Sequence, residues 1–324
     1  MSLIPDHFPY TYDKDIQSEF QQLESRLRHA MGNVHHVPEA GKKFHIGGAS
    51  SSKARTRGWN DTNPDQPERR ERWLKMLDSG ARGFKTNDEW IDELDAKRLG
   101  EVGDPTPERI AMQMAEAGRD CDAAIIDGLK GDAHTGATGS TAVSFPTGNV
   151  IDVDFGAANS GCTYTKLVRG KTLLGAANVT GQRVETNSKI AYVCTHFEIE
   201  DLLHEDKFIS SDYAGTRERA EAGEIFDHAG ITFIPVSPGL LPLETYSGGK
   251  KRDTYMFAKS AVAFGIGCDR TTRVTQEGTK NSAILLHLVY GFTCGRIHDK
   301  GVRKIQSART TAQAAMEETM EGDV

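Results

Sequence analysis

Two glycine-rich segments approach the spacings that cradle nucleotide phosphates. Gly131 and Gly136 fit the frame Gly-x-x-x-x-Gly, but Ala137 stands where a phosphate-binding loop needs its lysine. Residues 265–267 (Gly-Ile-Gly) are half of a dinucleotide fingerprint, and Arg270 occupies the place of its third glycine. Because each segment lacks the residue that would complete the site, we expect no nucleotide cofactor.

The sequence also lacks motifs that would bring a nucleophile and its base, or several metal ligands, together. No Gly-x-Ser-x-Gly elbow and no His-Glu-x-x-His pair occurs. His35 and His36 are adjacent, so in an extended segment they point to opposite sides and would not share an ion. The five cysteines are far apart and predict buried free thiols rather than a disulfide framework or a zinc site: Cys121, Cys162, Cys194, Cys268 and Cys294. We expect no metal and no catalysis. An oligomeric α+β enzyme with a site near the Gly-rich loop 131–148 stays open as the alternative.

Composition and charge narrow the class of protein. The 324 residues are 37% apolar and 26% charged, as in a soluble globular protein of one large or two modest domains. No apolar run is long enough to span a membrane, and the N-terminus lacks the order of a signal peptide. The net charge of −7 argues against a general nucleic-acid coat. Residues 41–85 nevertheless hold eleven Lys/Arg and five Asp/Glu, a basic segment on an acidic body.

Helical periodicity predicts the elements that must position any functional side chain. The longest helix is expected at 104–130, where Asp104 can cap and small or apolar residues recur three and four apart. An amphipathic helix is expected at 13–31, with anchors Phe20, Leu23 and Leu27. Further helices are expected within 89–99, at 165–177 and from Thr195 to Leu203, where Thr195 and Glu198 form a capping box.

Strands are predicted between these helices. They are expected at 43–46, 149–155, 189–194, 230–236, 255–258, 268–276, 283–292 and 302–305. Residues 49–73 are rich in turn formers, yet Trp59 and Trp73 argue against plain disorder. The small, polar and acidic residues of the tail after Gln306 predict a mobile end.

The order of these elements resembles the major capsid proteins of tailed bacteriophages, which share the Hong Kong 97-like fold. EFQQLESRLR (19–28) resembles the arm helix of one capsid family of this group. DLLHEDKFISSDYAG (201–215), GEIFDHAGITFIPV (223–236) and FAKSAVAFGIGCD (257–269) resemble later stretches of that family. The similarity runs from about residue 10 to about residue 306 and consists of packing and turn patterns.

The resemblance implies an α+β fold divided as in those proteins. Residues 1–40 would be the N-terminal arm, 41–92 the E-loop region, and 93–159 the P-domain with its spine helix at 104–130. Residues 160–265 would be the A-domain, 266–306 strands returning to the P-domain, and 307–324 an acidic tail. The chain starts almost directly at the arm, which implies a separate scaffolding protein or assembly without one.

The resemblance also implies the function and partners. The chain would be the major capsid protein of a double-stranded DNA phage, assembling in the host bacterial cytoplasm through pentamers and hexamers into the virion shell. A portal, possible decoration proteins and DNA enclosed without sequence-specific binding would accompany it, with no membrane involved. Subunit contacts are expected from the arm and from the basic loop, through Phe20, Leu23, Leu27, Arg55, Arg57, Trp59, Arg69, Arg70, Arg72 and Trp73.

Overall fold

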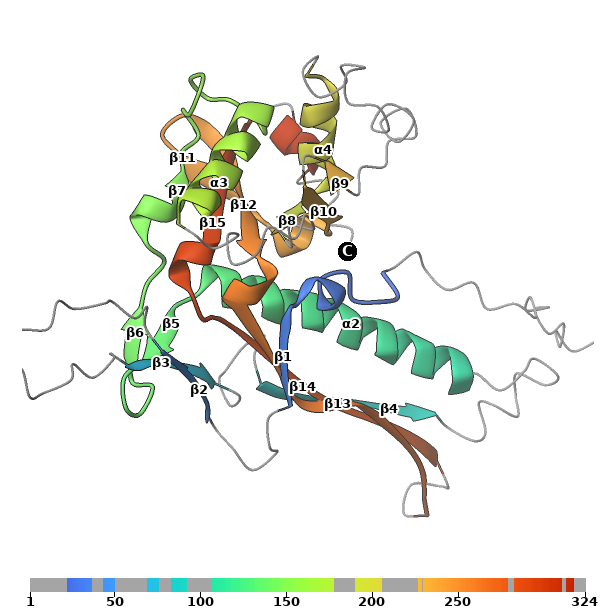
Figure 1. Ribbon diagram of the computed structural model, residues 1–324. Helices are drawn as coiled ribbons and strands as arrows, with labels where there is room; N and C mark the ends of the chain where they lie inside the picture. The colour runs from blue at the N-terminus through green and yellow to red at the C-terminus, as the bar shows by residue number, and fades with distance from the viewer. Residues whose placement is uncertain are drawn as a thin grey trace, which may run out of the picture.

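A computed structural model gives the fold of the protein. It describes residues 22–36, 43–49, 69–75, 83–91, 106–177, 190–205, 227–228, 230–278, 283–310 and 313–317. Within these residues the strands form three sheets, which we call the helix sheet, the large sheet and the hairpin sheet. Figure 1 shows the long helix α2 (Thr106–Lys130) crossing the middle of the molecule, with the large sheet on one side and the other two sheets on the opposite side.

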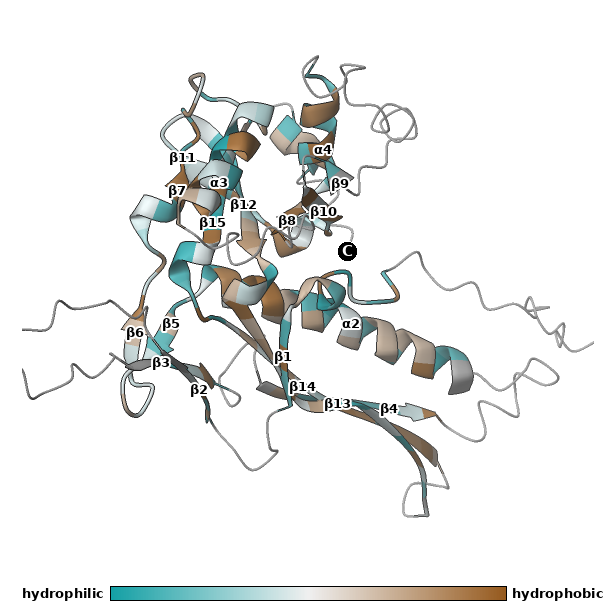
Figure 2. Ribbon diagram, in the orientation of Figure 1, coloured by the Kyte–Doolittle hydropathy of each residue, from teal (hydrophilic) through white to brown (hydrophobic). Residues whose placement is uncertain are grey.

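The helix sheet lies against α2. Its strand order is β1 (Asn33–His36), β13 (Val262–Glu277), β14 (Ala283–Arg296) and β4 (Gly83–Ile91). β13, β14 and β4 are antiparallel, whereas β1 runs parallel to β13. Figure 2 shows apolar residues on α2 and on the strands beneath it. The contact is close because Gly128 lies over Cys294: a Cβ on Gly128 would be 2.6 Å from the Cys294 carbonyl carbon.

The large sheet carries the remaining long elements. Its strand order is β7 (Val150–Ile151), β15 (Val302–Arg309), β12 (Gly249–Ala258), β8 (Ile190–Cys194), β10 (Ile231–Pro235) and β9 (Asp227–His228), and β11 (Leu243–Tyr246) pairs with β12. The helices α3 (Tyr164–Ala176) and α4 (His196–Leu203) pack on it. β8 and β10 are parallel neighbours, and α4 leaves the end of β8. Every residue of β8 is buried, as its apolar run predicts.

The hairpin sheet joins two distant parts of the chain. Its strand order is β2 (Lys43–Ala49), β3 (Arg69–Lys75), β5 (Ala133–Thr135) and β6 (Thr141–Val143). Short 3-10 helices connect the larger elements: η1 (Arg28–Ala30), η2 (Thr147–Asn149), η3 (Pro238–Leu240), η4 (Lys259–Ala261) and η5 (Asp299–Gly301).

Most elements predicted from periodicity are confirmed, including α2, α3, α4, β2, β8 and β10. The helix predicted at 13–31 is wrong over its described part, where residues 22–27 are irregular and only η1 follows. The helix predicted within 89–99 is wrong at Glu89–Ile91, which belong to β4 because they pair with β14. Of the strand predicted at 149–155, only Val150–Ile151 forms.

The strands within 266–306 belong to two sheets. The resemblance implies that they return to one domain, the P-domain, and that division stays a prediction. In the structure β13 and β14 stay in the helix sheet, whereas β15 pairs with β12 and β7 in the large sheet. The mobile tail predicted after Gln306 is wrong for the described residues 307–310 and 313–317. Ser307–Arg309 continue β15, and residues 313–317 form a helical turn whose Ala314 and Glu317 are buried.

Candidate functional site

The N-terminal segment 22–36 is fixed to α2 by one carboxylate. Asp122 is fully buried in the middle of the helix. Its oxygens accept hydrogen bonds from the Gln22 side chain (2.6 Å), the Ser25 hydroxyl (2.6 Å) and the backbone amides of Arg26 and Leu27 (both 3.0 Å). A turn of irregular backbone would otherwise leave these amides without an acceptor. Asp122 thus replaces the hydrogen bonds that a helix would have supplied.

Packing and a second ion pair continue this attachment. The segment passes close to α2 at Gly118, where a Cβ would be 3.1 Å from the Ser25 amide nitrogen. Arg28 then donates to both carboxylate oxygens of Asp269 on β13, at 3.2 and 2.8 Å. Leu27 is fully buried in its own chain's core, whereas Leu23 remains 64% exposed. Leu23 is therefore free to meet another subunit, and Leu27 is not.

Trp73 holds the β2–β3 hairpin against the glycine-rich loop. Its indole Nε1 donates to the Gly136 carbonyl oxygen at 2.6 Å. Gly139 has a φ of +67°, and a Cβ there would be 2.6 Å from Trp73 Cγ, so only glycine fits. The loop 131–148 therefore forms the β5–β6 hairpin and a seat for an indole ring.

Arg296 and Asp299 join the β2–β3 hairpin to the end of α2. Arg296 is buried and donates to the Leu129 carbonyl at 2.8 Å, to the Gly131 carbonyl and to Asp299 Oδ1 at 3.2 Å. Asp299 Oδ2 accepts from Arg72 Nη2 of β3 at 2.7 Å. Burial lowers the pKa of Arg296, and the bond to Asp299 opposes that effect. Arg296 and Asp299 thus connect the helix end, β3 and the crossing into β15.

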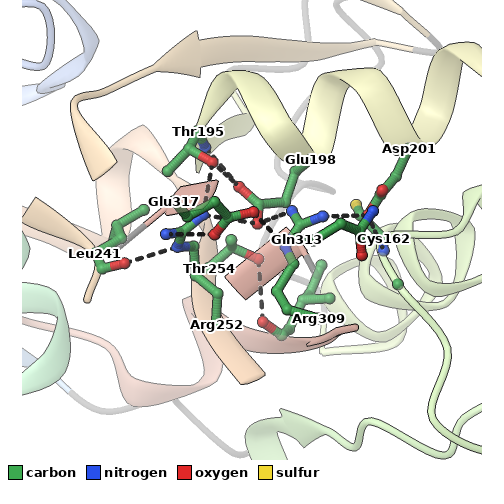
Figure 3. A network of polar contacts seen from close by, with 12 residues as sticks. Cys162, Thr195, Glu198, Asp201, Leu241, Arg252, Thr254, Arg309, Gln313 and Glu317 are labelled. Carbon is green, nitrogen blue, oxygen red and sulfur yellow. Dashed lines mark hydrogen bonds and ion pairs between the residues drawn. The ribbon is translucent and has the colours of Figure 1, made fainter. Parts of the chain in front are cut away.

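A second charged cluster is buried beside the large sheet. Figure 3 shows Arg252 of β12 and Arg309 of β15 directed toward carboxylates of α4 and of the C-terminal turn. Arg309 contacts Glu198 at 2.5 Å and Asp201 at 2.9 Å, and Arg252 contacts Glu317 at 2.9 Å. Removing one partner from such a network leaves a buried charge uncompensated and costs about 3–5 kcal/mol. The cluster therefore fixes α4 and the C-terminal turn on the sheet.

Local capping hydrogen bonds form at the two chain segments that supply the carboxylates of this cluster, the start of α4 and the C-terminal turn. Thr195 and Glu198 form the predicted capping box at the start of α4, with the Thr195 amide donating to Glu198 Oε2 at 2.7 Å. At the C-terminal turn the Thr310 amide donates to Gln313 Oε1 at 3.1 Å, and the Gln313 amide donates back to Thr310 Oγ1 at 3.3 Å. The Thr-x-x-Gln spacing is a sequence signal for this turn.

Groups that could serve catalysis have structural surroundings in the described residues. They contain no group of three or more His, Cys, Asp or Glu side chains that could hold a metal ion. Burial raises the pKa of Cys121 to about 11 and that of Cys162 to about 12, so neither thiol is activated. The ammonium of Lys166 is enclosed by the carbonyls of Ser160, Gly161 and Gln306. No helix in the described part of the chain is long and apolar enough to cross a membrane.

The expected interface residues fall into four groups. Leu23 is exposed. Phe20, Arg55, Arg57 and Trp59 lie outside the described residues. Arg69 and Arg70 belong to β3. Leu27, Arg72 and Trp73 make contacts within their own chain, as shown above. Sequence reasoning missed Asp122, Arg252, Arg296 and Asp299, because a single charged residue in a helix or strand carries no local signal of burial.

In these contacts, polar side chains attach the N-terminal segment and the β2–β3 hairpin to the rest of the chain. Solved structures share its fold. The structure of Mycobacterium phage Che8 is 15% identical with a TM-score of 0.63, and covers 93% of this chain and 97% of that chain. The capsid of cyanophage Pam1 is 10% identical with a TM-score of 0.65, covering 95% and 98%. The capsid of Helicobacter pylori bacteriophage KHP30 is 11% identical with a TM-score of 0.64, covering 95% and 98%. The expected α+β, Hong Kong 97-like fold is confirmed.

The family follows from the sequence itself. A family model described as phage capsid protein matches residues 4–308, and the chain belongs to that family. A comparison with curated proteins returned no match. The expectation of a major capsid protein is confirmed, and with it a structural role in the shell of a virion. The enzyme alternative with its site near 131–148 has no support.

Proposed function

We propose that the protein forms pentamers and hexamers that close into the icosahedral head of a tailed double-stranded DNA phage. Residues 1–40 act as the N-terminal arm, 41–92 as the E-loop, 93–159 as the P-domain and 160–265 as the A-domain. The fold shared with phage capsids and membership of the capsid family support this proposal. The large sheet contains the strands of the proposed A-domain, β8 to β12, together with β7 and β15, and the helix sheet contains β13 and β14 together with β1 and β4.

The observation that carries the proposal is that the N-terminal segment and the β2–β3 hairpin are each fixed to the rest of the chain. Asp122 fixes the N-terminal segment, and Arg72 with Trp73 fixes the β2–β3 hairpin. Nineteen residues, 50–68, lie between the last pair of that hairpin, Ala49 and Arg69, and return to the same point. We infer that these residues, with Arg55, Arg57 and Trp59, contact a neighbouring subunit.

The remaining partners follow from the function. We infer assembly in the host bacterial cytoplasm, assisted by a separate scaffolding protein, with a portal at one vertex and possible decoration proteins outside. The net charge of −7 supports DNA enclosure without tight binding, since a basic inner wall would hold phosphates strongly.

Sedimentation velocity and negative-stain microscopy of the concentrated protein, alone and with its scaffold, test the proposal. Capsomers or closed shells are the expected result. A monomer or dimer under every condition would contradict it. A variant with Arg55, Arg57, Arg69 and Arg70 changed to Glu should assemble poorly, whereas the same four positions changed to Lys should retain assembly. Arg72 stays unchanged in both variants, because it supports its own chain.

A further inference from the structure

Three separate parts of the chain meet at Arg296 and Asp299. Through Arg296 the junction holds the Leu129 carbonyl in the last turn of α2, the Gly131 carbonyl just after the helix, and the Val143 carbonyl of β6 at 3.3 Å. The guanidinium also lies over the Phe145 ring, 5.0 Å from its centroid. A cation at the C-terminal end of a helix is favoured by the helix dipole. Arg296 thus defines a fixed point at the end of α2.

Asp299 is held rigidly beside that point. Its backbone oxygen accepts from Asn149 Nδ2 at 2.6 Å, and η5 begins at Asp299 itself. One carboxylate oxygen faces Arg296, and the other accepts from Arg72 at 2.7 Å. Arg72 also donates its Nε to the Ile297 carbonyl at 3.0 Å. These two hydrogen bonds of Arg72 therefore both end on the short connection between β14 and β15.

Other described contacts also hold the hairpin, and most of them lie between Trp73 and Lys75, away from residues 50–68. β3 pairs with β5 through Trp73 and His134, and the Trp73 indole bond lies at that same place. Leu74 is buried, Thr293 Oγ1 donates to the Lys75 carbonyl at 2.7 Å, and Lys43 Nζ of β2 donates to the Thr138 carbonyl at 2.9 Å. Closer to residues 50–68, the described bonds of β3 to the rest of the chain are those of Arg72 and the bond that Thr135 Oγ1 donates to the Glu71 carbonyl at 2.8 Å. Among these, Arg72 carries the charge-assisted bonds.

The direction of the hairpin matters because it is the base of a long segment. Extended chain reaches at most about 3.3 Å per residue, so half of residues 50–68 could reach about 30 Å beyond β2. A rotation of about 10° at the base would displace the far end by about 5 Å. An error of that size is comparable to the spacing of neighbouring strands, about 4.8 Å, and would misplace any contact there.

We propose that Arg72 and Asp299 are positioning residues for assembly: they set the direction in which the β2–β3 hairpin leaves the body by tying β3 to the end of α2. The proposal rests on the proposed function, in which the segment 50–68 meets a neighbouring subunit. It assigns the pair no role in chemistry and no direct contact with that neighbour. Its consequence is that shell geometry depends on an ion pair inside a single chain.

Three variants separate this role from simple stabilisation. Arg72→Met keeps the long stem and removes both hydrogen-bond donors with the charge. Arg72→Lys keeps the charge but cannot make both bonds at once. Arg109→Met is the matched control, because Arg109 pairs with Glu89 at 2.8 Å across α2 and β4, and is more exposed. Each is compared with the wild type by thermal unfolding, amide hydrogen exchange and microscopy of assembled particles.

We expect Arg72→Met to leave Tm within a few degrees of the wild type. Amide exchange in 43–49 and 69–75 should become about tenfold faster, the effect of losing a hydrogen bond to a charged group. Its particles should show a broader range of diameters and more open shells. Arg72→Lys should recover part of both effects, and Arg109→Met should match the wild type.

Two outcomes would overturn the inference. Wild-type exchange in the hairpin with Arg72→Met shows that the pair does not hold its direction. Faster exchange together with unchanged particles shows that the direction does not govern assembly. A wild type that never assembles counts against the proposed function instead, and the exchange measurement still decides whether Arg72 positions the hairpin.

Discussion

The carboxylate of Asp122 accepts a hydrogen bond from the backbone amide of Leu27 at 3.0 Å, although the two residues are 95 positions apart in the sequence. Leu27 is fully buried, so this bond and the packing of its side chain act at the same point. Leu27, Ala30 and Met31 are therefore part of the subunit core, although they belong to the segment 1–40 proposed as the arm.

Replacing Asp122 should weaken the whole subunit. Asp122→Ala removes the acceptor of four hydrogen bonds, two of them from backbone amides. We expect a loss of about 2–5 kcal/mol, because each buried donor left without a partner costs about 1–3 kcal/mol. Denaturant unfolding measures it. Glu108→Ala, an exposed position in the first turn of α2, is the control and should change stability by less than about 0.5 kcal/mol. Equal stabilities would show that water satisfies these amides.

Truncations should locate the boundary between arm and core. Removing residues 1–32 takes away Leu27, Ala30 and Met31, all members of the main core cluster. Loss of one buried leucine side chain costs about 2–5 kcal/mol, so this deletion should unfold the subunit or reduce its Tm strongly. Removing residues 1–21 should leave the circular dichroism spectrum and Tm close to the wild type while reducing assembly. A stable subunit after the longer deletion would contradict the core assignment.

Adding a methyl group at Gly128 should push α2 away from β14 of the helix sheet. The new Cβ would be 2.6 Å from both the carbonyl carbon and the Cβ of Cys294, and backbone cannot yield there. Overpacking of this kind costs about 1–3 kcal/mol, more than the helix propensity gained by Gly128→Ala. Gly148→Ala is the control, since nothing lies within 4 Å of its added Cβ. Calorimetry of both variants checks the difference, and a stabilised Gly128→Ala would refute it.

The docking of the C-terminal turn should depend on pH. Burial raises the pKa of Glu317 above its ordinary value of 4.5, against the opposing effects of Arg309 and Arg252. A carboxyl with a raised pKa binds its proton more tightly when docked. Its contribution is therefore complete below pH 4.5 and is lost as pH rises through the raised value. The pKa of Asp201 is also raised by burial, so it acts in the same direction.

Amide exchange of residues 313–317, corrected for the intrinsic effect of pH, measures this docking. Protection should fall as pH rises above about 4.5 in the wild type. Glu317→Gln keeps the shape of the side chain and removes its titration, so its protection should vary less. Protection that rises with pH in the wild type would mean that the ionised carboxylate is the preferred form between the two arginines.

The sequence predicts elements whose stabilising contacts are local. α2 follows from its spacing of apolar residues, and α4 follows from the Thr195–Glu198 capping box. The segment 22–31 has the same apolar stripe but is not an α-helix, because Asp122 satisfies its amides from another part of the chain. Glu89 to Ile91 likewise prefer the strand because β14 lies alongside. Tertiary pairing overrides local propensity at both places.

The candidate site was predictable only in part. Trp73 was expected to matter because an indole is costly to expose, and it makes a specific contact with the Gly136 carbonyl. Its partner is the subunit's own loop, and contact with a neighbour stays a prediction. Asp299 and Arg296 carry no signal in the sequence, since their surroundings depend on three chain segments that converge only after folding.

Two short connections carry the chain between the large sheet and the helix sheet. η4 links β12 to β13, and residues 297–301 link β14 to β15. A pulling force between the two sheets would therefore be shared by two covalent tethers with almost no slack. It would also run along strands whose ladders resist in shear, where many hydrogen bonds act together. We therefore expect a subunit built in this way to stretch little, and the elasticity of a shell to lie mainly in the contacts between subunits.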